Sequence, residues 1–197
     1  MKNVTMLFSF LTLFISCKTY DKLELSESLS KMVNRDQEIQ NLIMDNGGKD
    51  KNKSDSLNLL KNQIFESNYL KIKSIYEDIG YPSISKYGKE NSYNYWLLVQ
   101  HCDNDVLFQE NILKKMKKLV NKNDVNKKNY AYLYDRVMKN KGAKQLYGTQ
   151  FSYLPPNYEL QILNIEDSIN VDVRRKEVGL EPLSEYIKQM KDILNNR

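Results

Sequence analysis

Apolar residues recur every three or four positions along most of the chain after residue 20, which is the spacing of amphipathic α-helices. The first such run, from Leu25 to Ile43, predicts a helix that ends near residue 45. Residues 46–56, which hold two adjacent glycines and five charged residues, are predicted to form a solvated connection. Further helices are predicted over residues 57–79, 92–102, 105–120, 127–139, 168–178 and 183–194.

Residues 145–163 break the helical pattern. They combine aromatic residues and partial alternation of polarity with a Pro155-Pro156-Asn157 turn, which favours a short β-hairpin over a helix. A two-stranded ribbon is only marginally stable alone, so it is expected to lie against the helices. Because no internal repeat or interdomain linker is visible, the sequence predicts a mainly α fold, a single helical domain with one small β-hairpin near residues 145–163.

The N-terminal segment has the pattern of an export signal. Lys2 gives a positive start, and residues 4–15 form a mostly apolar run of twelve. Twelve helical residues reach only about 18 Å, whereas a bilayer core is about 30 Å thick, so the run is too short to span a membrane. It ends in Ser16-Cys17, which resembles a bacterial lipoprotein box and implies cleavage after Ser16 and lipid attachment to Cys17. The alternative is an ordinary secretory signal in which Cys17 is incidental.

These features divide the chain into three predicted segments. They are a lipoprotein signal peptide at 1–16, lipidated Cys17 with a tether and first helix at 17–53, and a helical domain at 54–197. The protein is therefore expected to be anchored to a membrane of the bacterial cell envelope through Cys17, on the periplasmic side or the cell surface. Cys102 would then be the single remaining thiol, and its apolar neighbours predict a buried, inert cysteine.

Composition narrows the possible functions. The 197 residues include 30 Lys and Arg against 25 Asp and Glu, and this evenly spread net charge of +5 does not indicate a nucleic-acid partner. One histidine and two cysteines are too few for a zinc finger or a disulfide framework. No Gly-rich phosphate loop, H-E-x-x-H or G-x-S-x-G motif occurs. We expect no cofactor, no nucleic acid, and a small-molecule or protein ligand of unknown identity.

The first candidate site surrounds the sole histidine. Gln100 and His101 end a strongly apolar helical run, and Asp103 and Asp105 follow directly. In a continuous helix His101 and Asp105 would share a face, whereas a turn at Asp103 would make Asp105 a helix cap. Either arrangement places a carboxylate near the imidazole, which is half of a general-base pair. The alternative is a structural histidine in the core.

A second candidate group lies within the helix predicted at 127–139. Tyr132, Asp135 and Arg136 are separated by three and four positions and are predicted to share one helical face. Arg136 on the wall of a cleft would suit a carboxylate or a phosphate, because the planar guanidinium matches both. Alternatively, Asp135 and Arg136 form a buried ion pair that fixes this helix to its neighbours.

The third candidate group is Gln145, Tyr147, Thr149 and Gln150, whose polar side chains could converge on a ligand. Gly148 lies among them in a predicted strand, which indicates a close approach of the backbone to another part of the structure. Thr149 and Tyr147 are the attractive hydroxyls near the histidine, but neither lies in a known nucleophile motif.

A metal-dependent site is weakly indicated. It would combine one imidazole with carboxylates, drawn from His101, Asp103, Asp105 and Asp135. Because a single imidazole with oxygen ligands is poor support for a metal, none is predicted.

Several runs of the sequence resemble one uncharacterised bacterial family. They are Trp-Leu-Leu-Val-Gln-His at 96–101, Ala-Tyr-Leu-Tyr-Asp-Arg-Val at 131–137, Gln-Leu-Tyr-Gly-Thr-Gln at 145–150 and Val-Asp-Val-Arg-Arg at 171–175. The pattern is similar to domain of unknown function 6624 over about residues 55–190, although Ala is more usual at the position of Cys102. Since that family has no assigned activity, the resemblance implies where a site lies but gives no residue a catalytic role.

Two functional hypotheses follow. In the first, the protein is a ligand-binding or interaction module whose polar pocket around His101 is bordered by Asp105, Arg136 and Gln150. In the second, it is a hydrolase in which His101 is the general base, an aspartate that follows it orients the ring, and Arg136 stabilises developing negative charge. Both predict one shared cleft bordered by His101, Asp135, Arg136 and Gln150. A purely structural lipoprotein is the remaining alternative.

Overall fold

The computed structural model describes residues 20–154 and 159–195 of the chain. Its helices are α1 (Lys22–Asn46), α2 (Lys51–Ile79), α3 (Ile84–Tyr87), α4 (Lys89–Val99), α5 (Val106–Val120), α6 (Lys127–Asn140), α7 (Val171–Glu177) and α8 (Leu183–Asn195). A 3₁₀ turn, η1 (Ser168–Asn170), precedes α7, and the two strands are β1 (Phe151–Leu154) and β2 (Glu159–Ile162). The mainly helical fold with one small hairpin is confirmed. The predicted signal peptide and Cys17 lie outside the described residues.

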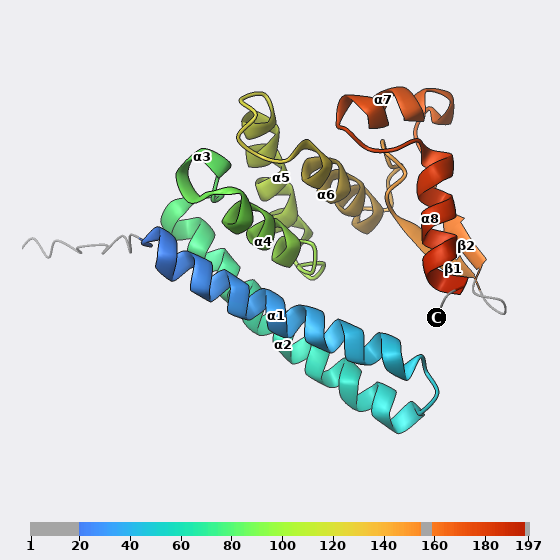
Figure 1. The fold of residues 1–197 in the computed structure, drawn as a ribbon, viewed down its shortest axis with the longest axis horizontal. Helices are drawn as coiled ribbons and strands as arrows, with labels where there is room; N and C mark the ends of the chain where they lie inside the picture. Colours follow the sequence, from blue (N-terminus) through green and yellow to red (C-terminus); the bar gives the residue numbers. More distant parts are fainter. Residues whose placement is uncertain (1–19, 155–158, 196–197) are drawn as a thin grey trace, which may run out of the picture.

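The two longest helices, α1 and α2, form a hairpin that extends away from the remaining helices (Figure 1). The turn between them covers only residues 47–50, so the connection predicted at 46–56 was too long. Gly47 takes a left-handed conformation with a φ of 52°, and the Asp50 side chain caps α2 by accepting from the Lys53 backbone N–H. The polar residues that follow Asp50 are helix-compatible on an exposed surface, so they continue α2 instead of interrupting it.

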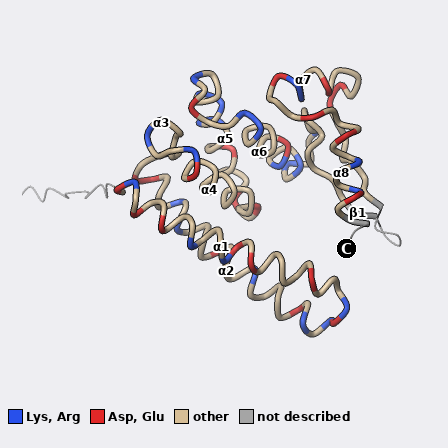
Figure 2. Tube along the Cα trace, in the orientation of Figure 1, with Lys and Arg blue, Asp and Glu red and all other residues tan. Residues whose placement is uncertain are grey.

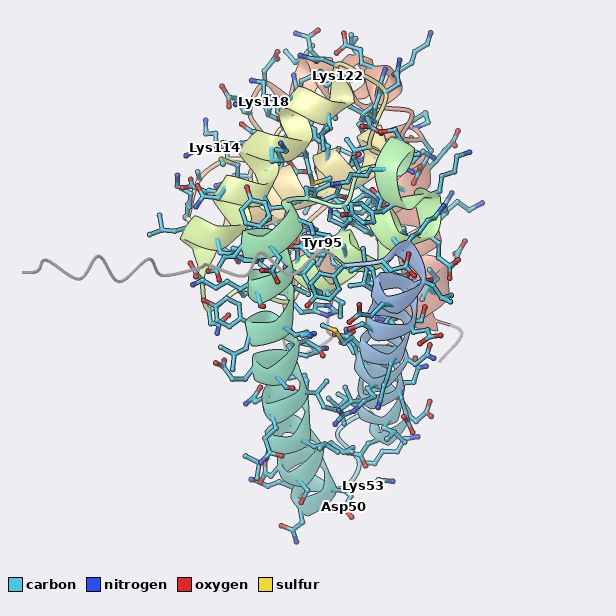
Figure 3. All side chains as sticks on the ribbon, turned by 90° about the vertical axis from the view of Figure 1, so that its left-hand side faces the viewer. Asp50, Lys53, Tyr95, Lys114, Lys118 and Lys122 are labelled. Atoms are coloured by element: carbon cyan, nitrogen blue, oxygen red, sulfur yellow. The ribbon has the colours of Figure 1, made fainter. Side chains whose placement is uncertain are left out.

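Helix α4 lies against this hairpin, and seven of its eleven residues are buried. It packs against both α1 and α2, and the buried Tyr95 hydroxyl donates to the backbone oxygen of Ile72 at 2.9 Å (Figure 3). The core around it contains large apolar side chains, namely Leu25, Leu29, Ile72, Ile75, Leu98, Val99, Ile112, Met116, Leu133 and Val137. The unpredicted α3 precedes α4, and α4 ends at Val99, so His101 lies in the turn that follows the helix.

The C-terminal third packs beside α6. Strands β1 and β2 pair antiparallel with Phe151 opposite Ile162, and the Phe151 ring lies 6.2 Å from that of Tyr186 on α8. The predicted hairpin is therefore confirmed, and it lies against a helix. Gly148 falls in the loop before β1, not in a strand, but the predicted close approach is present. A Cβ there would lie 2.7 Å from Ile165 Cδ1, and its φ of +67° also favours glycine.

Positions of Lys and Arg are interspersed with positions of Asp and Glu along the described chain (Figure 2). Lys114, Lys118 and Lys122 follow one exposed face of α5 and its C-terminal turn, and they point away from the core (Figure 3). This lysine-rich stretch is a solvated helix face. No helix within the described residues is both long and apolar enough to cross a membrane.

Candidate functional site

A cleft of about 330 Å³ opens between the C-terminal end of α4, one face of α6, the segment before β1, and α8. Its lining residues are Leu97, Gln100, His101, Tyr132, Arg136, Lys139, Thr149, Gln150, Phe151 and Tyr186. Four stretches that are far apart in sequence therefore meet at one surface. His101, Arg136 and Gln150 border this common cleft, as the sequence predicted for them, whereas Asp135 does not.

Helix α6 separates its polar residues between two sides. Tyr132, Arg136 and Lys139 are spaced by four and three positions and line the cleft together. Asp135 faces the loop before β1 and is completely buried. The predictions that Asp135 shares the face of Tyr132 and Arg136, and that Asp135 and Arg136 form an ion pair, were wrong. Consecutive residues of a helix point in directions about 100° apart. Asp135 therefore faces the backbone N–H groups of the loop before β1, whereas Arg136 faces Asp103.

His101 is held by residues of the helical hairpin. Its Nδ1 lies 2.7 Å from Asp36 Oδ2 on α1, and its Nε2 lies 3.1 Å from the Gln40 amide nitrogen. The imidazole also stacks on Phe65 of α2, with ring centroids 4.5 Å apart and planes 2° from parallel. A carboxylate does lie beside the imidazole, but it is Asp36 and not Asp103 or Asp105.

These contacts define what His101 can do. With the Gln40 amide nitrogen facing Nε2, the neutral tautomer that satisfies both contacts carries its proton on Nδ1 and donates it to Asp36. The lone pair of Nε2 is then occupied by Gln40. The Asp36 carboxylate is fully buried, and its other hydrogen bond comes from the adjacent Gln37. His101 is therefore a structural partner of a buried carboxylate as well as part of the cleft wall.

Asp103 fixes the arginine of the cleft. Arg136 donates from Nε and Nη2 to the two carboxylate oxygens at 2.9 and 2.5 Å, and Asn140 and Gln109 donate to the same carboxylate. Partial burial opposes ionisation, but the Arg136 hydrogen bonds and charge outweigh it and lower the pKa of Asp103. This bidentate contact holds the guanidinium of Arg136 in one orientation.

Asp105 lies apart from the cleft and caps α5, which is the second of its two predicted arrangements. Its carboxylate accepts from the Phe108 backbone N–H at 2.9 Å, from the Tyr69 hydroxyl at 2.7 Å and from Lys73 at 3.3 Å. The Tyr69 hydrogen bond, the Phe108 N–H and the lysine lower the pKa of Asp105. The prediction of Asp105 as a border of the pocket around His101 is not matched by the geometry, because its oxygens face α2 and α5.

Asp135 organises the loop between α6 and β1. Its two oxygens accept from the backbone N–H groups of Leu146, Tyr147 and Thr149 and from the Thr149 hydroxyl, at 2.8 to 3.1 Å. Burial raises the pKa of Asp135, although the four donors act in the opposite direction. The buried carboxylate therefore fixes the backbone conformation of residues 146–149.

The loop residues divide between structure and cleft. Gln145 is buried and joins the base of the hairpin, donating to the backbone oxygens of Gln150 and Leu163 and accepting from the Gln150 N–H. The Tyr147 ring packs edge-on against Tyr134, outside the cleft lining. Thr149 and Gln150 do line the cleft, but the Thr149 hydroxyl already donates to Asp135. Neither hydroxyl considered from the sequence is thus placed as a nucleophile beside His101.

Gln100 is the most unusual polar residue of the cleft. The residue is 7% exposed, and its amide nitrogen is buried with no hydrogen-bond partner in the described part of the chain. A buried donor without an acceptor costs about 1–3 kcal/mol, so native structures contain few of them. Gln100 is one of the residues that line the open cleft, so this buried donor lies beside the space that a bound molecule would occupy.

Four residues that matter here were not predicted from the sequence, namely Asp36, Gln40, Lys139 and Tyr186. For Asp36 a signal was present, because it follows Met32 by four positions and precedes Ile39 by three, which places a carboxylate on the apolar face of α1. Lys139 also follows Arg136 by three positions on a helix. The contacts of Gln40 and Tyr186 depend on tertiary packing and leave no local pattern.

Two further predictions concern metal binding and Cys102. Within residues 20–154 and 159–195, no group of three or more His, Cys, Asp or Glu side chains could hold a metal ion. His101, Asp103, Asp105 and Asp135 instead point to different partners. Cys102 is 1% exposed, and burial raises the pKa of its thiol, so it is the buried free cysteine that the sequence predicts.

The chain matches one protein family. A model of the family of unknown function DUF6624 matches residues 23–196. The match confirms the predicted resemblance and extends it beyond residues 55–190 to include α1, which carries Asp36 and Gln40. No curated protein and no solved structure matches the chain.

Proposed function

The chain belongs to the family of unknown function DUF6624, and we propose that it is a lipid-anchored cell-envelope protein whose cleft between α4, α6 and α8 binds a ligand. The observation that carries the proposal is the buried amide nitrogen of Gln100, which has no acceptor among the described residues although it lies in the cleft wall. A ligand acceptor would satisfy that donor and offset the cost of its burial.

Among the described residues, buried atoms without a hydrogen-bond partner also occur at Asn68, Asn91, Trp96 and Arg175, but of these five residues only Gln100 lines the cleft. Asp135, Asp103, Gln109 and Gln145 are each engaged by two or more hydrogen bonds to other parts of the chain. Because the unpaired amide of Gln100 belongs to a residue of the cleft lining whose polar neighbours are paired, it supports ligand binding at this place.

A hydrolase with His101 as general base is the second candidate, and the 2.7 Å contact with Asp36 favours it. Two observations make it weaker. The Gln40 amide already occupies Nε2, and the Thr149 hydroxyl donates to Asp135. Hydrolysis of p-nitrophenyl acetate that disappears in His101→Ala and increases in Gln40→Ala would support this candidate over simple binding.

The binding proposal can be tested by filling the cleft without removing a polar group. Leu97→Trp adds bulk to the lining, and Leu60→Trp makes the same change in a separate groove between α1 and α2. A mixed library of anionic, cationic and neutral fragments is screened by saturation-transfer NMR against the full chain and both variants. We expect a subset of fragments to bind the wild type and Leu60→Trp but not Leu97→Trp. If no fragment shows this dependence, the cleft is not a ligand site.

The membrane anchor rests on the Ser16-Cys17 junction of the sequence. Cys17→Ser removes the thiol that would carry the lipid, so lipid attachment and processing at this junction should both be blocked. The mass of the mature protein and its partitioning into detergent report the two events. An unchanged mass together with unchanged partitioning would contradict the anchor.

A further inference from the structure

We propose that the ligand of this cleft is a small anion whose phosphate or carboxylate is attached to a ring, with the anionic group at Gln100, Arg136 and Lys139 and the ring against Tyr132 and Tyr186. The inference rests on the proposed binding function and names the chemical class of the ligand.

The polar part of the cleft offers donors and positive charge. Lys139 is exposed, and no carboxylate pairs with it within residues 20–154 and 159–195. Arg136 uses Nε and Nη2 on Asp103, which leaves Nη1 to reach a ligand from a fixed guanidinium. The described lining contains no Asp or Glu, but Asp103 outside it pairs with Arg136. Lys139 therefore brings the unpaired positive charge, and Arg136 and Gln100 add hydrogen-bond donors. This combination suits a phosphate or a carboxylate, which accept several hydrogen bonds and carry negative charge.

The part of the cleft beside these polar groups is aromatic. The rings of Tyr132 and Tyr186 meet edge to face with centroids 6.3 Å apart, and Phe151 packs against Tyr186. Tyr132 also contacts Trp96, whose ring supports it from α4. Burial raises the pKa of Tyr132 and of Tyr186, so both phenols stay neutral. Such a wall suits the face or edge of a ring.

Helix α6 sets the distance between these two parts. Tyr132, Arg136 and Lys139 follow one another at about one-turn intervals, and a turn rises about 5.4 Å. The segment from Trp96 to Asp103 runs alongside in the same direction, because Trp96 contacts Tyr132 and Asp103 binds Arg136. A ring that directly bears its anionic group is short enough to touch the tyrosines and the cations together.

Four probes separate the requirements for charge and ring. Phenyl phosphate and benzoate carry both features, inorganic phosphate carries the anion alone, and benzyl alcohol carries the ring alone. Affinities for the full chain are measured by isothermal titration calorimetry at low ionic strength. We expect phenyl phosphate or benzoate to bind at least about tenfold more tightly than either half-probe, since each adds a second set of contacts. The tighter of the two identifies the anionic group as phosphate or carboxylate.

Matched variants locate the anion. Lys139→Gln should weaken the better ring-bearing anion by about tenfold or more, because a charge-assisted hydrogen bond is lost. Lys144→Gln removes the same charge from an exposed position outside the lining and should leave the affinity unchanged. Gln100→Leu should also weaken binding while leaving the thermal melting temperature equal or higher, which shows that the variant is folded and that the amide has no structural role.

These experiments separate a failure of the ring-bearing anion proposal from a failure of the proposed binding function. If benzyl alcohol binds as tightly as the anions, or if Lys144→Gln weakens binding as much as Lys139→Gln, the cleft does not select a ring-bearing anion. In that case fragments that require an open cleft in the Leu97→Trp screen would still establish a ligand site of another class. If that screen also finds none, the binding function itself fails.

Discussion

Asp135 and Arg136 are neighbours in sequence, yet they serve opposite sides of α6. Asp135 is fully buried, and its four hydrogen bonds all come from the loop at 146–149. Arg136 is held by Asp103 and also lines the cleft. A buried polar group whose hydrogen bonds all lie within the chain stabilises the fold, whereas a polar group with an unused donor at a cleft is available to a ligand.

Two buried glutamines repeat this contrast. The Gln109 amide donates to the Val99 backbone oxygen and to Asp103, and its oxygen accepts from Asn140. The Gln100 amide nitrogen is equally enclosed but has no partner among the described residues. Side-chain type and burial are nearly the same, so only the pairing of each amide separates a structural glutamine from a candidate binding residue.

The largest effect is expected from Asp135→Ala. Removing the carboxylate leaves three loop N–H groups and one hydroxyl buried without their acceptor, so the free energy of unfolding should fall by about 3–5 kcal/mol. Urea denaturation measures the loss, and Asp192→Ala on the exposed side of α8 is the matched control. A loss below about 1 kcal/mol would mean that Asp135 does not organise the loop.

A smaller loss is expected from His101→Ala. The variant removes the imidazole partner of the buried Asp36 carboxylate and the stacking contact with Phe65, which should cost about 2–3 kcal/mol. A double-mutant cycle with Asp36→Asn isolates the pair, since its coupling energy disappears if the two side chains act independently. An unchanged melting temperature in His101→Ala would instead assign the histidine wholly to a ligand.

The pH dependence of stability should report Asp103. Its pKa is lowered on folding, so the stability that it contributes is present above its ordinary value of 3.8 and is lost as the pH falls through the lower pKa of the folded state. The melting temperature of Asp103→Asn should therefore fall less steeply than that of the wild type as the pH drops below 3.8. Parallel acid limbs in the two proteins would contradict the role assigned to the Arg136 contact.

The sequence predicts the helices well because their apolar spacing is local. The start of α2 was not predicted, because its residues are polar and carry no apolar pattern although they are compatible with a helix. Helix α3 was not predicted because its single turn is too short to show a pattern. The sequence also locates the cleft through Gln100, His101, Arg136 and Gln150.

Sequence spacing does not determine which partner each polar side chain takes. Asp36 and His101 are 65 positions apart, and Asp103 and Arg136 are 33 apart. Local spacing instead suggests nearby carboxylates for the histidine and Asp135 for the arginine, and both suggestions were wrong. Only the packing of α1 and α6 around the end of α4 decides these pairs.

The side-chain amide signals of Gln100 and Gln109 test the central claim most directly. In ¹⁵N-resolved NMR spectra of the full chain, phenyl phosphate is titrated in and both NH₂ groups are followed. We expect the Gln100 signals to shift with saturating dependence on probe concentration, because its free donor gains an acceptor, while the Gln109 signals stay near their starting positions. If the Gln100 signals remain unchanged while phenyl phosphate binds elsewhere, or if no binding occurs, the unpaired amide is not reserved for this ligand.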